Sequence, residues 1–244
     1  MFNFSYDRKI LYIVIGILVV ISLTSLMTDP NSLFSTLLGI PGVLIAITFH
    51  EFAHGLVAYK LGDNTAKMEG RLSLNPFAHL DPIGTLMLVF VGIGWGKPVH
   101  VNPSNYTRKI SMEKGEAIVS AAGPIMNILL AFVFGIIYYV ILKFAGVAFL
   151  NSTVGWVIML MIQSTIVINI GLGVFNLIPL PPLDGSKILM PFLPYKAKQW
   201  FINNEQIFYL IFIVLWISGL AGRIITPAIY WLANGIMSIC SLIL

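Results

Sequence analysis

The residues best suited to chemistry are His50, Glu51 and His54, which form an HExxH motif inside the apolar run 39–59. Residues four positions apart lie on one face of a helix, so His50 and His54 can hold one metal ion together. Glu51 can then take a proton from a metal-bound water. Ionisable residues at membrane depth are costly and are by default functional. The motif therefore predicts a zinc hydrolase whose site lies within a bilayer or at its edge.

The composition is that of an integral membrane protein. Of the 244 residues, 58% are hydrophobic and 10% are charged, whereas soluble domains carry about 25% charged residues. The single cysteine, Cys240, excludes an internal disulfide and a cysteine-based zinc site. The net charge of +4 comes from dispersed basic residues, which indicates orientation in a membrane and no binding of nucleic acid.

A helix needs about 20 apolar residues to cross the bilayer. The sequence therefore predicts an all-α polytopic membrane protein with about six transmembrane helices, at residues 9–27, 37–60, 115–143, 154–178, 205–221 and 223–243. The apolar stretch 85–95 is too short to span and is rich in glycine. Residues alternate in the neighbouring segments 70–76 and 97–103. We expect these pieces to form a short β-like re-entrant element beside the active-site helix.

The basic residues predict an orientation. An inside N-terminus places twelve of the 14 lysines and arginines in the inside loops. The positive-inside rule then predicts two cytoplasmic termini, with the HExxH motif in the cytoplasmic half of the membrane. We expect one integral membrane domain over residues 1–244, with a core at about 37–194 and a C-terminal helix pair at about 205–243.

A catalytic zinc site usually has three protein ligands and a water, so one ligand is still to be found. Asp184 is the main candidate, because it follows the proline-rich segment 176–183 at the cytoplasmic end of the fourth expected span. The prolines prevent a regular helix there, so the carboxylate can turn back toward a neighbouring helix. His79 and Asp81 remain alternatives. A loop histidine such as His79 is, however, more often solvated or part of a turn.

The motifs resemble those of a known family. HEFAH in a membrane helix, followed later in the chain by NLIPLPPLDG, resembles the site-2 protease family of intramembrane zinc metalloproteases, peptidase family M50. The segment Gly123-Pro124-Ile125-Met126-Asn127 is similar to another family motif. The run GRLSLNPFAHLDPIGT is similar to the compact prokaryotic subgroup, which has no PDZ or CBS domain.

The resemblance implies a role for each matching residue. His50, His54 and Asp184 would be the ligands of one Zn²⁺ per chain, and Glu51 would be the catalytic base. Asn176 would bind the substrate or the oxyanion, and Asn127 is a further candidate for that role. Interhelical hydrogen bonding is the alternative for both asparagines.

The resemblance also implies a substrate class and a location. The chain would cleave single-span membrane proteins, in regulated intramembrane proteolysis, as a multi-pass protein of a prokaryotic cell membrane in contact with lipid. Its oligomeric state is open, and a homo-oligomer is one option. The alternative function is a catalytically silent zinc-binding pseudoprotease or chaperone, against which Glu51 argues. A transporter would show inverted repeats and paired charges, and the sequence shows neither.

Overall fold

The computed structural model describes residues 24, 30–82, 84–85, 96–107 and 109–243. Within these residues, four helices are long and apolar enough to cross a membrane: α2 (Pro30–Lys60), α5 (Met112–Phe144), α7 (Thr153–Asn176) and α11 (Leu220–Ile243). The shorter helices are α3 (Thr65–Met68), α6 (Val147–Leu150), α8 (Asp184–Leu189), α9 (Tyr195–Asn203) and α10 (Glu205–Ile217), with 3₁₀ turns η1 (Pro76–Ala78), η2 (Pro103–Asn105) and η3 (Met190–Phe192).

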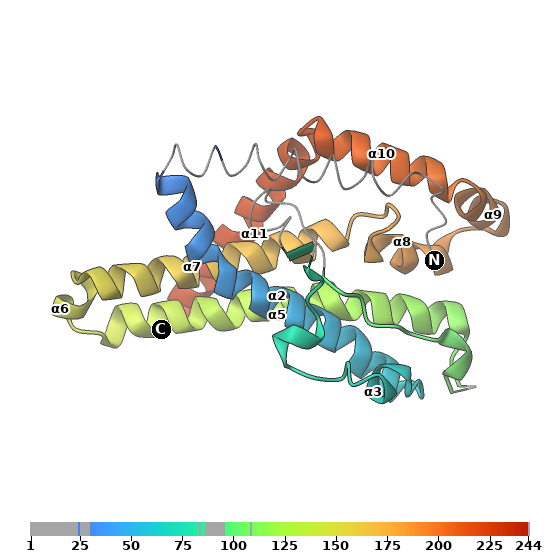
Figure 1. Ribbon diagram of the computed structural model, residues 1–244, viewed down its shortest axis with the longest axis horizontal. Helices are drawn as coiled ribbons and strands as arrows, with labels where there is room; N and C mark the ends of the chain where they lie inside the picture. Colours follow the sequence, from blue (N-terminus) through green and yellow to red (C-terminus); the bar gives the residue numbers. More distant parts are fainter. Residues whose placement is uncertain (1–23, 25–29, 83, 86–95, 108, 244) are drawn as a thin grey trace.

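The long helices pack into one bundle. α2, α5 and α7 contact one another, and α11 packs against α5 and α7 (Figure 1). A core of small and branched side chains fills the space between α5, α7 and α11: Ala131, Ile162, Ile166, Ile170, Ile236 and Cys240. On the outer face of α5, Ile125, Leu129 and Val133 are exposed, as contact with lipid tails requires. The bundle therefore fixes α2 against α5 and α7, where the site forms.

Four of the predicted spans correspond to helices of membrane length. They are the spans at 37–60, 115–143, 154–178 and 223–243, which match α2, α5, α7 and α11. The span predicted at 205–221 corresponds to α10, whose 13 residues extend only about 20 Å against a hydrocarbon core of about 30 Å. The span predicted at 9–27 falls almost entirely outside the described residues. The count of six spans therefore stays a prediction.

The predicted β-like element forms no strand in the described residues. The segments 70–76 and 97–103 are irregular or turn-like, and a single antiparallel bridge joins Leu80 to Gly96. Pro76, at the end of the first segment, and Pro98 and Pro103 in the second provide no N–H. The side chains of Asn75 and Asn102 cap η1 and η2. Alternation of residue type alone was thus a misleading signal. The rest of the element, at 86–95, lies outside the described residues.

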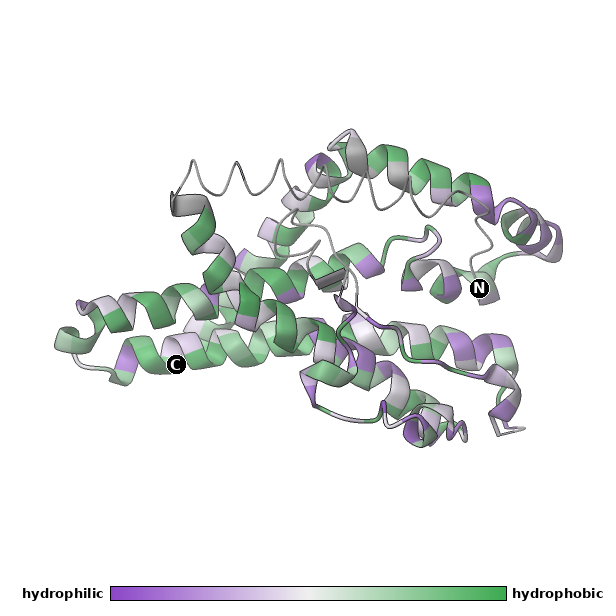
Figure 2. Cartoon of the chain, in the orientation of Figure 1, coloured by the Kyte–Doolittle hydropathy of each residue, from purple (hydrophilic) through white to green (hydrophobic). Residues whose placement is uncertain are grey.

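Polar residues gather at one end of the bundle, where α2 ends, α5 begins and α8 and α9 lie (Figure 2). Two ion pairs join these elements there. Lys187 Nζ lies 3.3 Å from Glu116 Oε1, and Lys198 pairs with Glu113. The proline-rich segment after α7 reverses the chain at this end and returns α8 to the side of α5. The residues that follow α7 are thereby brought to the depth of the HExxH motif.

Candidate metal centre and catalytic site

The HExxH motif occupies the last third of α2. His50 and His54 lie one turn apart on the same helical face, and their rings meet edge to face with centroids 4.6 Å apart. Both residues are buried, with exposed fractions of 6% and 8%. The two imidazoles are therefore directed into the protein interior, where they contact α5 and not lipid.

Each imidazole is held from behind by an oxygen atom of α5. His54 Nδ1 lies 2.7 Å from the Val119 carbonyl oxygen, which can only accept, so this nitrogen carries the proton. His50 Nδ1 lies 2.6 Å from Asn127 Oδ1. The Asn127 amide is oriented by its Nδ2, which donates to the Ala46 carbonyl oxygen at 3.0 Å. Its oxygen therefore accepts from His50, and both rings present Nε2 on their opposite side.

Asn127 belongs to a buried chain of amides that connects three helices. Its Nδ2 also donates to Asn169 Oδ1 of α7 at 3.1 Å, and Asn169 Nδ2 donates to the Thr165 carbonyl oxygen at 2.8 Å. Both asparagines are fully buried. With its hydrogens used in this way, Asn127 has no donor for an oxyanion, and the geometry supports the hydrogen-bonding alternative. Sequence reasoning missed Asn169, although a lone amide inside an apolar span is a usable signal.

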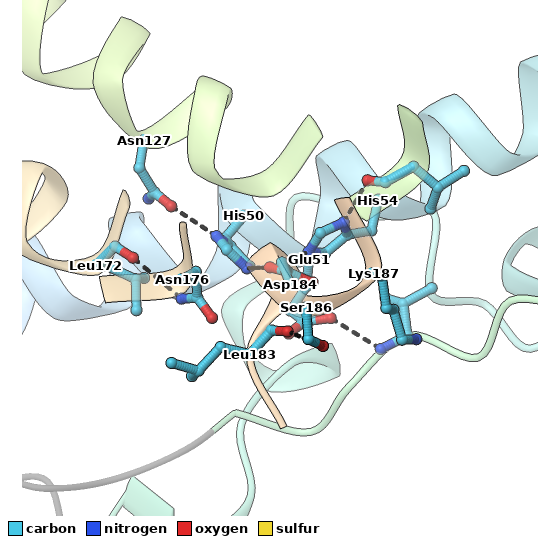
Figure 3. Close-up of polar contacts among 12 residues, drawn as sticks. His50, Glu51, His54, Asn127, Leu172, Asn176, Leu183, Asp184, Ser186 and Lys187 are labelled. Carbon is cyan, nitrogen blue, oxygen red and sulfur yellow. Dashed lines mark hydrogen bonds and ion pairs between the residues drawn. The ribbon is translucent and has the colours of Figure 1, made fainter. Parts of the chain in front are cut away.

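Asp184 is the first residue of α8 and meets both histidines (Figure 3). Its Oδ2 lies 3.2 Å from His50 Nε2 and 3.3 Å from His54 Nε2. One donor atom from each of the three residues lies within 4.8 Å of the other two. A carboxyl group with the ordinary pKa of Asp is ionised at neutral pH, so Asp184 offers a carboxylate oxygen to the two rings.

The convergence of these three atoms requires positive charge between them. Imidazoles that carry their protons on Nδ1 direct the lone pairs of Nε2 toward the carboxylate oxygen, so the three atoms repel one another unless a cation or added protons intervene. In tetrahedral zinc sites with bonds of about 2.0–2.1 Å, ligand atoms lie about 3.4 Å apart. The distances of 3.2 and 3.3 Å are close to this value. Two imidazoles and a carboxylate are also a donor set of zinc hydrolases. The residues therefore fit Zn²⁺.

Gly123 of α5 allows the two helices to approach closely at this point. A Cβ atom at this position would lie 2.5 Å from His54 Nε2 and 2.7 Å from His50 Nε2. Any other residue would have to displace a ring or separate the helices. The Gly123–Asn127 segment thus has two roles at the site. Gly123 leaves room for both imidazole rings, and Asn127 fixes the ring of His50 through Nδ1.

A cavity of about 270 Å³ lies beside the cluster. Its walls include His50, Glu51, His54, Val99, Asn176 and Asp184. Glu51 Oε2 accepts a hydrogen bond from the Val99 N–H at 2.8 Å. A candidate base, three candidate ligands and space for a substrate segment are therefore contiguous. Sequence reasoning did not single out the contact between Glu51 and Val99, because 48 positions separate them.

Asn176 is the last residue of α7 and reaches the cavity wall. Its Nδ2 donates one hydrogen bond, to the Leu172 carbonyl oxygen at 3.0 Å. In the described part of the chain, this leaves the second amide hydrogen for a substrate oxygen. The position of Asn176 therefore differs from that of Asn127, which lies behind the histidine.

The remaining candidates lie away from the cluster. His79 is fully buried and hydrogen-bonds through Nε2 to the Ser73 carbonyl oxygen at 2.7 Å, so it is not solvated. It is the C-cap residue of η1, which agrees with the expectation that it belongs to a turn. Among the described residues it neither joins the metal-type cluster nor lines the cavity. Asp81 Oδ1 accepts from the Gly84 N–H at 2.7 Å, a turn contact. His100 is at the surface, 3.0 Å from Glu69.

Comparisons with known proteins agree on one family. The family model described as "Peptidase family M50" matches residues 141–219. The chain is 36% identical over 188 residues to "Putative zinc metalloprotease YwhC" of Bacillus subtilis, which covers 76% of this chain and 82% of that protein. It is 29% identical over 207 residues to "Putative zinc metalloprotease Rip2" of Mycolicibacterium smegmatis, and the alignment covers 80% of this chain and 72% of that protein. It is 27% identical over 224 residues to "Putative zinc metalloprotease MJ0611" of Methanocaldococcus jannaschii, and the alignment covers 88% of this chain and 98% of that protein. No solved structure matches significantly.

Proposed function

Because the chain belongs to peptidase family M50 and is a zinc metalloprotease of site-2 protease type, we propose that it cleaves peptide bonds of membrane-spanning proteins within the membrane. His50, His54 and Asp184 hold one Zn²⁺ per chain, and Glu51 is the general base. The observation that carries this proposal is the convergence of both Nε2 atoms on Asp184 Oδ2, at 3.2 and 3.3 Å, beside a cavity that Glu51 lines.

In the proposed hydrolysis, each residue of the site has a separate role. Zn²⁺ in this site supplies the positive charge that makes water acidic at neutral pH and polarises a carbonyl. Glu51 accepts the proton of the attacking water and passes it to the nitrogen of the departing amine. Asn176 donates its second amide hydrogen to the oxygen on which negative charge develops. Asn127 and the Val119 carbonyl hold the histidine rings in place throughout.

We also propose a topology for the whole chain. It is one integral membrane domain of six spans, with both termini in the cytoplasm and the site in the cytoplasmic half of the membrane. The substrate is a single-span membrane protein, whose helix must unwind because helical carbonyls are occupied by hydrogen bonds. The extended residues 97–102 and the segment 179–184 border the site and offer backbone groups to the unwound segment. The partners are this substrate and lipid, with no nucleic acid.

The test measures zinc and cleavage on the same samples. The chain is purified in detergent as wild type and as His54→Ala, Asp184→Ala and Glu51→Gln, and each is analysed for zinc and incubated with single-span substrates. We expect one zinc per wild-type chain, little in the first two variants, and full zinc without cleavage in Glu51→Gln. His100→Ala, which changes an exposed histidine, is the matched control and should behave as wild type.

Each other result has a defined meaning. Zinc that survives Asp184→Ala would remove Asp184 from the ligand set. A Glu51→Gln chain that retains its cellular effect would favour the silent pseudoprotease. A folded wild type that binds no zinc would refute the site as proposed.

A further inference from the structure

Residues 96–107, called the strap below, run beside α2 and form one wall of the cavity. At the start of the strap, a Cβ on Gly96 would meet Ile47 Cγ2 at 2.8 Å. At its end, the Thr107 N–H donates to the Leu61 carbonyl oxygen at 2.7 Å. Between these points, Pro98, Val99 and Val101 line the cavity. The strap thus follows the active-site helix from before the HExxH motif to its C-terminal end.

Within the described residues, the strap belongs to no sheet. An extended segment of this kind has no ladder of hydrogen bonds to fix its register, so its position depends on individual anchors. One of these contacts is the Val99 N–H on Glu51 Oε2, which joins the strap directly to the proposed base. The residues that anchor the strap therefore also fix the position of the Val99 N–H relative to Glu51.

Asp63 is the most highly bonded anchor. It is fully buried just beyond α2. Its Oδ2 accepts from the Asn102 N–H at 2.7 Å, and its Oδ1 accepts from Asn105 Nδ2 at 2.8 Å. The N–H and hydroxyl of Thr65 complete the set at 3.1 and 2.5 Å. Burial acts to raise the pKa of Asp63, but these hydrogen bonds outweigh it and lower the pKa below its ordinary value.

Gly62 makes this anchorage sterically possible. Its φ of 111° lies in the region that other residues avoid, and a Cβ there would lie 3.0 Å from the Asn105 carbonyl oxygen. The chain can therefore turn sharply after α2 and place Asp63 directly under the strap. The same turn brings Asn105 close enough for its side chain to reach the carboxylate.

We propose that Asp63 is a positioning residue for proteolysis, which acts by fixing the strap so that the Val99 N–H stays on Glu51. This inference rests on the proposed function. Val99 and Asn102 are three residues apart, so at most about 10 Å of chain connects them. With the Asn102 N–H bound to Asp63, Val99 has little freedom to leave the base. Because Asp63 touches neither the cavity nor the cluster of three ligands, its effect is transmitted through the strap.

The test combines hydrogen exchange with kinetics. In Asp63→Asn, amide exchange in peptides covering 96–107 should accelerate about tenfold or more, as expected for loss of hydrogen bonds to a charged acceptor. The value of kcat should fall by a similar factor, while zinc content and the exchange of α5 and α7 stay at wild-type values. Glu69→Gln is the matched control, because Glu69 also contacts the strap, at His100, but through an exposed pair. It should change neither quantity.

A second variant separates positioning from general stability. In a Val99→Pro background the N–H is already absent, so Asp63→Asn should lower kcat much less there than in the wild type. Equal losses in both backgrounds would overturn the proposal, as would an Asp63→Asn chain with wild-type exchange in the strap. If Asp63→Ala or Asp63→Asn fails to fold, Asn105→Ala removes a single donor and must accelerate exchange in the strap in the same direction.

The exchange measurement also distinguishes two kinds of failure. A wild-type chain that binds zinc but cleaves no substrate would count against the proposed function, while the strap could still be seen to loosen in Asp63→Asn. A chain that cleaves normally after Asp63→Asn would count against the positioning role alone. The two conclusions therefore depend on different readouts of the same preparations.

Discussion

Replacing Gly123 with alanine tests the metal centre without touching a proposed ligand. The added Cβ would lie 2.5 Å from His54 Nε2 and 2.7 Å from His50 Nε2, whereas ordinary contacts begin near 3.4 Å. The rings or α5 must therefore move by about 0.7–0.9 Å, several times the tolerance of about 0.2 Å for metal–ligand distances. The rings cannot rotate away freely, because Val119 and Asn127 hold their Nδ1 atoms.

The expected result is weaker zinc binding in a folded protein. Disturbing the groups that orient zinc ligands typically costs 10- to 100-fold in affinity, or about 1.4–2.8 kcal/mol. Because Gly123→Ala acts on both rings, we expect at least the upper part of this range. The affinity is measured by competition with a chromogenic chelator in detergent, and cleavage is followed on the same samples. Cleavage should fall at limiting zinc and recover in part when zinc is added.

Gly135→Ala is the matched control on the same helix. Its Cβ would crowd Cys240 Sγ at 2.9 Å, far from the site. It should lower thermal stability and leave zinc affinity unchanged. If Gly123→Ala bound zinc as tightly as the wild type, the three donor atoms would not be the metal site, and the assignment of His50, His54 and Asp184 would be refuted.

Three further predictions follow from the same contacts. Asn127→Leu removes the acceptor of His50 Nδ1 and should weaken zinc binding about 10- to 100-fold while the bundle stays folded, as chelator competition and circular dichroism will show. Lys187→Gln breaks an ion pair between half-exposed side chains and should change stability by less than about 1 kcal/mol, with zinc content unchanged in metal analysis. Removal of zinc with a chelator should abolish cleavage and lower the melting temperature, and added Zn²⁺ should restore both, because a ligand that binds only the folded chain stabilises it.

The parts of the site that sequence predicts are those set by local periodicity or by a compact motif. Helical spacing alone places His50 and His54 on one face, and the structure brings them together. Asp184 was singled out by its depth at the end of a span and by its proline-rich context, and it lies beside both rings. Four membrane-length helices likewise follow from long apolar runs, because such runs have few alternatives to a helix in lipid.

The parts that sequence does not predict depend on contacts between distant residues. The amide of Asn127 and its partner Asn169 are 42 positions apart, and Glu51 meets Val99 across 48. Nothing local in the chain encodes such pairs. The β-like element failed for a related reason, since a strand exists only with a ladder partner, and alternation in 70–76 and 97–103 specifies none. The burial of His79 could not be predicted either, because a loop histidine is buried only when the loop folds over it.

The site has two sides that are held in different ways. Behind the histidines, α5 and α7 supply buried oxygens and amides from regular helices, which packing in the bundle fixes in place. In front, the strap and α8 supply the Val99 N–H and Asp184 from segments held by turns, by Asp63 and by an exposed ion pair. In the proposed function, a substrate that unwinds beside Glu51 meets the side of the site whose position depends on a few side-chain anchors, Asp63 among them, while the imidazoles are oriented by the helices behind them.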